Sequence, residues 1–163
     1  MLESIALLAL LASATADAFP PLGIAEPSEA VSAVDSCLKA AAPGKIDETR
    51  LAAEGWQEQP GVWPNAHIFT RQGNGAVVIT MDAPLAGTCY VRVRLANDAS
   101  IEAVGEAIDR QFGVIGKRRT GEAGKFFWRK DNAFVGSEGF DDGPGYPPHV
   151  IQIAVGELPK EIR

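Results

Sequence analysis

Residues 89–95 read CYVRVRL, and this stretch decides the expected fold. Its residues alternate between two sets, and a period of two predicts a β-strand with one buried face. The expected inward set is Cys89, Val91, Val93 and Leu95. The expected outward set is Tyr90, Arg92 and Arg94. We therefore expect a sheet whose cysteine-bearing face packs against other elements.

The sequence on both sides of this strand predicts further strands. Upstream, residues 67–71 and 76–81 flank Gly73-Asn74-Gly75, a turn that predicts a β-hairpin. Residues 56–63 contain Pro60, so only a loop or a weak edge strand is expected there. Because neighbouring strands are joined by short turns, the sheet is expected to be antiparallel. Downstream strands are expected at 114–120, 125–129, 133–135 and 150–155.

Two stretches have the three- and four-residue spacing of a helix with one buried face. The first contains Val31, Val34, Leu38 and Ala41, with Ser28 as the expected N-cap and Pro43-Gly44 at its end. The second contains Ile101, Val104, Ile108 and Phe112. A short helix capped by Asp47 is expected over 47–54. The predicted fold is α+β, a two-layer sandwich of a mainly antiparallel sheet of about five to six strands with two main helices on one face.

The N-terminal residues 1–18 have the pattern of a secretory signal peptide. An unbroken apolar run, Ile5 to Ala12, precedes two A-x-A triplets of the kind found at cleavage sites. Glu3 stands where a basic residue is usual, and a buried N-terminal helix is the alternative interpretation. We expect an exported protein, periplasmic or extracellular, with residues 19–163 as one domain and no transmembrane segment in the mature chain.

The two cysteines are expected to form a disulfide. Cys37 borders the apolar face of the first helix, and Cys89 lies on the inward face of its strand. Disulfides persist in exported proteins, so a Cys37–Cys89 bridge would fix that helix to the sheet. The alternative is a pair of buried free thiols, which would also leave a cysteine nucleophile open.

Basic residues are concentrated in one part of an acidic chain. Residues 92–130 contain nine of the fifteen basic residues but only five acids, within a chain of net charge −6. The predicted binding surface consists of Arg92, Arg94, Lys117, Arg118 and Arg119. An anionic component of the cell envelope or an acidic protein is the expected partner, and nucleic acid is not expected. The alternative is a solvated sheet face whose arginines resist edge pairing.

Catalytic motifs are weak in this sequence. The long loop expected after residue 136 carries Glu138, Asp141 and Asp142, but their spacing does not match a calcium loop. His149, with Asp141 or Asp142, is the candidate pair for a small hydrolase. His67 is the second histidine, and no zinc-ligand spacing or nucleotide-binding fingerprint is present, so no metal or cofactor is predicted.

Three functional hypotheses follow from these patterns. The first is a non-catalytic binding or interaction protein of the cell envelope, which the segregated charge and the weak catalytic motifs favour. The second is the hydrolase that would use the His/Asp pair after residue 136. The third is a structural subunit, which an exposed apolar patch of several hundred Å² would favour.

Overall fold

The computed structural model describes residues 21–60, 63–112, 126–130, 132–139 and 148–157. The elements in chain order are α1 (Pro27–Ala40), β1 (Ala41–Ala42), β2 (Lys45–Ile46), α2 (Glu48–Ala53), β3 (Gln57–Gln59), β4 (Ala66–Arg71), β5 (Asn74–Met81), β6 (Thr88–Arg94), α3 (Asp98–Phe112), β7 (Phe126–Lys130), β8 (Ala133–Gly139) and β9 (Val150–Glu157). The strand expected over 114–120 lies outside the described residues.

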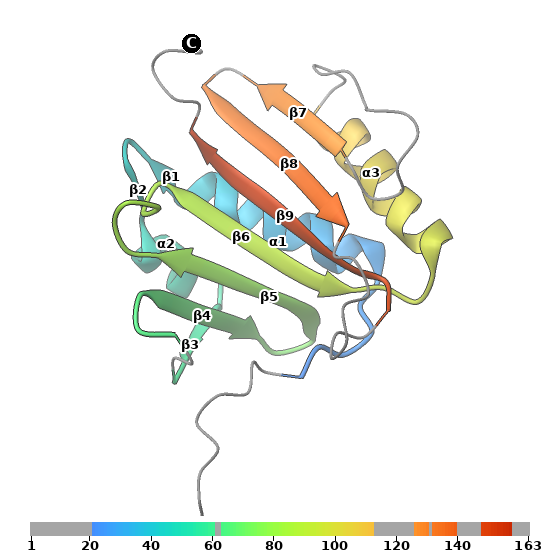
Figure 1. Cartoon of the computed structure of the whole chain (residues 1–163), viewed down its shortest axis with the longest axis horizontal. Coiled ribbons are helices and arrows are strands. Elements are labelled where there is room, and N and C mark those ends of the chain that lie inside the picture. Colours follow the sequence, from blue (N-terminus) through green and yellow to red (C-terminus); the bar gives the residue numbers. More distant parts are fainter. Residues whose placement is uncertain (1–20, 61–62, 113–125, 131, 140–147, 158–163) are drawn as a thin grey trace, which may run out of the picture.

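The main sheet is antiparallel, with strand order β3-β4-β5-β6-β9-β8-β7. Figure 1 shows α1 crossing behind the sheet and α3 beside it, near β7 and β8. The predicted α+β class, with helices packed on one face of an antiparallel sheet, is confirmed. The expected weak edge strand is β3, which raises the strand number of this sheet to seven. The pair β1 and β2 forms a separate two-stranded sheet.

Strand β9 has a position that local patterns do not predict. It is the last strand in the chain, yet it lies between β6 and β8 in the sheet (Figure 1). Its register places Val155 opposite Cys89 and Ile153 opposite Val91, so its apolar residues continue the inward face of β6. The β6–β9 pair therefore forms the centre of the core.

The loop expected after residue 136 begins later than predicted, because β8 continues to Gly139. Residues 136–139 have low strand propensity, but they pair with β9 from Gly136↔Ala154 to Gly139↔Ile151. Pairing with a central strand thus overrides local preference.

The start of α1 also differs from the prediction. The helix begins at Pro27 with Glu26 as its N-cap, not at a Ser28 cap. Proline is tolerated at the first helical position because the N–H that it lacks would have no partner within the helix. The Glu26 N–H donates to Glu29 Oε2 at 2.6 Å, and the N–H of Gly75 donates to Glu29 Oε1 at 3.1 Å. Glu29 thereby attaches the helix start to the β4–β5 hairpin.

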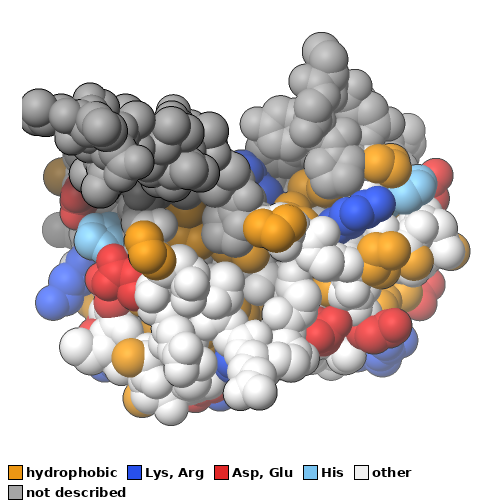
Figure 2. All heavy atoms as spheres, turned by 90° about the horizontal axis from the view of Figure 1, so that it is seen from below, with side chains coloured by type: hydrophobic (Ala, Val, Ile, Leu, Met, Phe, Trp, Pro, Cys, Tyr) orange, Lys and Arg blue, Asp and Glu red, His pale blue; other side chains and the backbone are white. Residues whose placement is uncertain are grey.

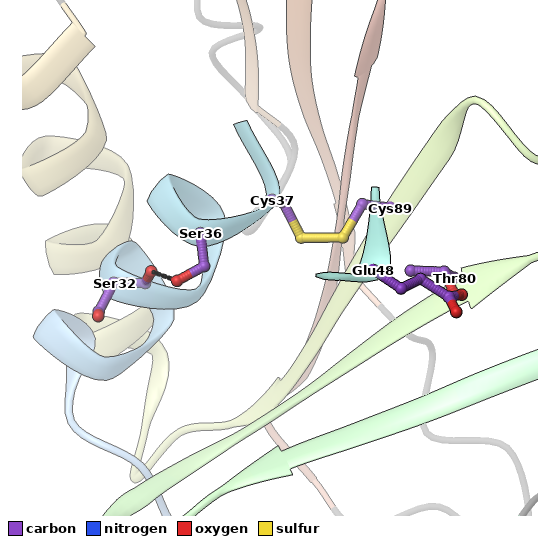
Figure 3. The surroundings of a disulfide bond; sticks show 6 residues. All are labelled: Ser32, Ser36, Cys37, Glu48, Thr80 and Cys89. Atoms are coloured by element: carbon purple, nitrogen blue, oxygen red, sulfur yellow. Dashed lines mark hydrogen bonds between the residues drawn. A yellow bond between two sulfur atoms is a disulfide. The ribbon is translucent and has the colours of Figure 1, made fainter. Parts of the chain in front are cut away.

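The predicted disulfide is confirmed. Cys37 of α1 is bonded to Cys89 of β6, and both side chains are fully buried (Figure 3). Thr80, opposite Cys89 in the β5–β6 register, donates a hydrogen bond to Glu48 at the start of α2. Both α1 and α2 are thus bonded to the sheet at the paired positions Thr80 and Cys89.

Both faces of the sheet bury apolar side chains. The inner face packs on the helices, where Val34 of α1 and Val78, Val91 and Ile153 of the sheet are fully buried. On the outer face, a smaller cluster comprises Ala66, Ile68, Val77 and Ile79, with Leu22, Met81 and Tyr90 packed against it. The outer face of β4–β5–β6 is therefore not the simple solvated face that alternation alone suggests.

Candidate functional site

Arg92 and Arg94 lie on the outer face of β6, as the alternation predicts. Arg92 is 8% exposed, its Nη2 donates to Gln152 Oε1 at 2.8 Å, and its guanidinium lies 5.9 Å from the centre of the Trp63 ring. Arg94 is half-buried, and its carbonyl accepts a hydrogen bond from the Ala25 N–H at 2.8 Å. The residues Lys117, Arg118 and Arg119 lie outside the described part of the chain. The basic binding surface therefore stays a prediction.

His149 lies beside Asp98, an acid that no sequence pattern pairs with it. Its Nδ1 lies 3.2 Å from Asp98 Oδ1 at the start of α3, and its φ of 60° is in the left-handed region. Asp141 and Asp142 lie outside the described residues. The hydrolase hypothesis, which needs one of them beside His149, also stays a prediction.

His67 lies among three carboxylates, an arrangement that sequence reasoning missed. Its Nδ1 is 2.9 Å from Glu58 Oε1 and 3.9 Å from Glu48 Oε2, and its Nε2 is 3.6 Å from Asp82 Oδ1. The hydrogen bond to Glu58 raises the pKa of His67, and partial burial opposes that rise. In Figure 2, histidine and acidic side chains lie together near both ends of the view.

The acids around His67 come from different elements, which is why no motif indicates them. Glu48 is the first residue of α2, Glu58 lies on β3, and Asp82 follows β5. Only the β3–β4 register, which places Glu58 opposite Phe69, brings the edge strand beside His67. Among the described residues, no group of three or more histidine, cysteine and acidic side chains is arranged to hold a metal ion.

A cleft lies between the C-terminal parts of α1 and α3 and the inner face of β7, β8 and β9. Its volume is about 400 Å³. The lining is mainly apolar: Leu38, Ala41, Phe112, Trp128, Ala133 and Val135. The polar lining residues are Asp35, Lys39, Asn132 and Glu157. We call this feature the helix–sheet cleft.

Strand register explains the floor of the helix–sheet cleft. Trp128 of β7 is opposite Val135 of β8, and Val135 is opposite Val155 of β9, so these three side chains form one inward row. Ala133 is opposite Glu157 in a second row on the same face. The small Ala133 side chain leaves space beside the larger Trp128.

Polar contacts fix the walls of the helix–sheet cleft. Lys39 Nζ lies 2.9 Å from Asp35 Oδ2 and 3.3 Å from Glu54 Oε1. The hydrogen bond to Asp35, followed by that to Glu54, raises the pKa of Lys39, because both carboxylates favour the charged ammonium. The Trp128 Nε1–H donates to Asp109 of α3, which orients the indole and connects β7 to α3.

The polar groups in the described lining of the cleft are two carboxylates, one ammonium and one amide. Its described lining contains no serine, threonine, cysteine or histidine, the side chains that most often act as nucleophile or general base. The disulfide excludes Cys37 and Cys89 as thiol nucleophiles. The sequence signal for the cleft was limited, because Trp128 and Phe112 follow core patterns and only tertiary packing leaves a space between them.

Comparison with known proteins gives no match: no protein-family model, no curated protein and no solved structure is similar to this chain. Across the described segments, no helix has both the length and the apolar character needed to cross a bilayer.

Proposed function

We propose that this protein is a non-catalytic binding protein whose ligand is a small, largely apolar molecule held in the helix–sheet cleft. The observation that carries this proposal is an apolar hollow of about 400 Å³ with a few polar side chains in its lining. Ligand sites are typically concave, of several hundred Å³, and apolar with a small number of orienting polar groups.

The sheet face that bears Arg92 supports binding less well than the cleft does. The Arg92 side chain is 8% exposed, and its guanidinium contacts Gln152 and Trp63. A partner that needs its charge would have to displace those contacts. The helix–sheet cleft has an open volume of about 400 Å³ beside its lining side chains, so we place the ligand there.

Export to the cell envelope or the exterior is part of the proposal. The apolar leader and the Cys37–Cys89 disulfide support it, because disulfides are rare in reducing compartments. The test is the intact mass of protein purified from its natural host. Loss of the first sixteen to eighteen residues supports export, and a full-length mass in the cytosolic fraction contradicts it.

The binding proposal is tested by titrating decanol, an uncharged apolar probe, while recording the indole N–H signals by two-dimensional NMR. The chain has three tryptophans, and Trp128→Phe assigns the signal of interest. We expect a saturable shift of the Trp128 signal and an unchanged signal for Trp56, which is buried under Arg71 at 4.7 Å.

A matched pair of alanine variants locates the probe. Ala133→Leu fills the cleft, whereas Ala52→Leu adds the same side chain at an exposed position of α2. We expect Ala133→Leu to abolish the shift and Ala52→Leu to retain it, with both variants folded by circular dichroism. Equal binding by the two variants, or no saturable shift in the wild type, would refute the proposed function.

A further inference from the structure

We infer that the ligand of the helix–sheet cleft is an organic cation, with an ammonium group carried on an apolar body. This inference rests on the proposed function and adds the charge of the ligand to it. Two observations support it: the balance of charges around the cleft and its aromatic lining.

Carboxylates predominate around the cleft in the part of the chain that the structure describes. Asp35 and Glu157 line it, Glu54 contacts Lys39, and Asp109 accepts the hydrogen bond from the Trp128 indole. Lys39 is the cation among the described lining residues, and its ammonium lies within 3.3 Å of two carboxylates. A ligand carboxylate would therefore meet mainly like charge, whereas a ligand ammonium would meet opposite charge.

The aromatic lining of the cleft also favours a ligand that carries an ammonium group. Trp128 and Phe112 contribute rings from β7 and from the last residue of α3. An ammonium is attracted to the face of an aromatic ring, most strongly to tryptophan, while the apolar body of a ligand packs against the same surface. Phe112 is the partly exposed ring of the cleft, whereas Trp128 is 4% exposed, so the main contact of an ammonium with an aromatic ring is expected at Phe112.

The test compares three probes that share one tail: decylammonium, decanol and decanoate. Calorimetric titration of the oxidised full chain gives the three dissociation constants at low and at high salt. We expect decylammonium to bind about fivefold tighter than decanol, and decanoate to bind more weakly than decanol. High salt should reduce these differences, because it screens the charges but not the apolar contact.

Two variants connect the charge preference to the cleft. Asp35→Asn removes one lining carboxylate, and Asp98→Asn is the control, since its exposed carboxylate contacts His149. We expect the ratio of decylammonium to decanol affinity to fall about twofold or more in Asp35→Asn and to stay unchanged in Asp98→Asn. Equal affinity for the three probes, or preference for decanoate, overturns the inference but leaves the proposed function intact. Failure of all three to bind overturns the proposed function itself.

Discussion

Removal of the Cys37–Cys89 disulfide should lower the stability of this protein substantially. The bridge joins residues separated by 52 positions, and both cysteines are fully buried. For a closed loop of this length, the entropy that the cross-link removes from the unfolded chain corresponds to about 4 kcal/mol at 25 °C. For a domain of this size, with an unfolding entropy of about 0.3 kcal/mol per kelvin, that corresponds to a fall in Tm of about 10–15 °C.

The assay separates the cross-link from the loss of the two side chains. Oxidised wild type is compared with wild type refolded in a reductant, which keeps both sulfur atoms, and with the double variant Cys37→Ala/Cys89→Ala. Urea unfolding monitored by circular dichroism gives the three free energies of unfolding. We expect the reduced wild type to be less stable than the oxidised protein by about 4 kcal/mol, and the double variant to be lower still because it leaves a cavity.

One result would refute the reasoning. If reduced and oxidised wild type differ by less than about 1 kcal/mol, the cross-link does not constrain the unfolded chain as loop closure requires. The contribution of residues 37 and 89 would then come from packing alone. If reduced wild type and the double variant have nearly the same free energy of unfolding, the cross-link itself, and not the cavity, accounts for the loss of stability.

Three further predictions concern the fold. Ile68→Ala, on the outer sheet face but fully buried, should lower the free energy of unfolding by about 2–5 kcal/mol in urea titration, and a loss below 1 kcal/mol would mean that this face is not core. Gly75→Ala would place its Cβ 2.8 Å from Ala25 Cβ and should lower the free energy of unfolding by about 1–3 kcal/mol. Gly23→Ala, with open space around its Cβ, should leave the free energy of unfolding nearly unchanged. Equal losses in the two variants would contradict the close contact at Gly75. His67→Gln should destabilise the protein by up to about 1 kcal/mol near pH 6 but not near pH 9. The reason is that the pKa of His67 is raised in the folded protein, so its protonation stabilises the fold. This contribution is complete below the unfolded pKa of about 6.5 and is lost as the pH rises through the folded pKa. A pH-independent loss, with His149→Gln as the control for removing a half-exposed imidazole, would show that the charge of His67 is not involved.

Local chemistry made the helices, the central strands and the disulfide predictable. The cap of α2 is one example: Asp47 Oδ1 accepts from the Thr49 N–H at 3.2 Å, and Gly55 follows the helix at a positive φ of 87°. The pairing of Cys37 with Cys89 is another, because helical and strand periodicity each placed one cysteine facing the core. In the first case the interacting residues are close in sequence. In the second, the periodicity of a single helix or strand shows which side chains face the core.

Long-range pairing was not predictable in the same way. Nothing near residues 150–157 indicates that β9 inserts between β6 and β8, since that choice depends on which exposed strand edge best matches its apolar face. The helix–sheet cleft and the His67 cluster both depend on such pairings. Trp128 illustrates this limit, because its sequence context predicts a core residue and only the positions of α1 and α3 leave a space beside it.

The geometry of α1 connects the disulfide to the proposed ligand site. Successive residues of a helix are rotated by about 100°, so Cys37 is bonded to the sheet while its neighbour Leu38 faces the helix–sheet cleft. The bridge therefore fixes the rotation and the position of the helix wall that carries Asp35 and Leu38. Without it, α1 keeps its packing and its polar contacts but loses its covalent link to the sheet, so the site loses pre-organisation.

This connection gives a final prediction. At a temperature where reduced wild type is still folded, it should bind decanol more weakly than the oxidised protein, by about threefold or more. The shift of the Trp128 indole signal reports binding in both states, and circular dichroism confirms that both are folded. Val34→Ala is the control, since it weakens the packing of α1 and keeps the bridge. If reduction leaves the affinity unchanged, packing and polar contacts position the α1 wall, and the disulfide serves stability without shaping the site.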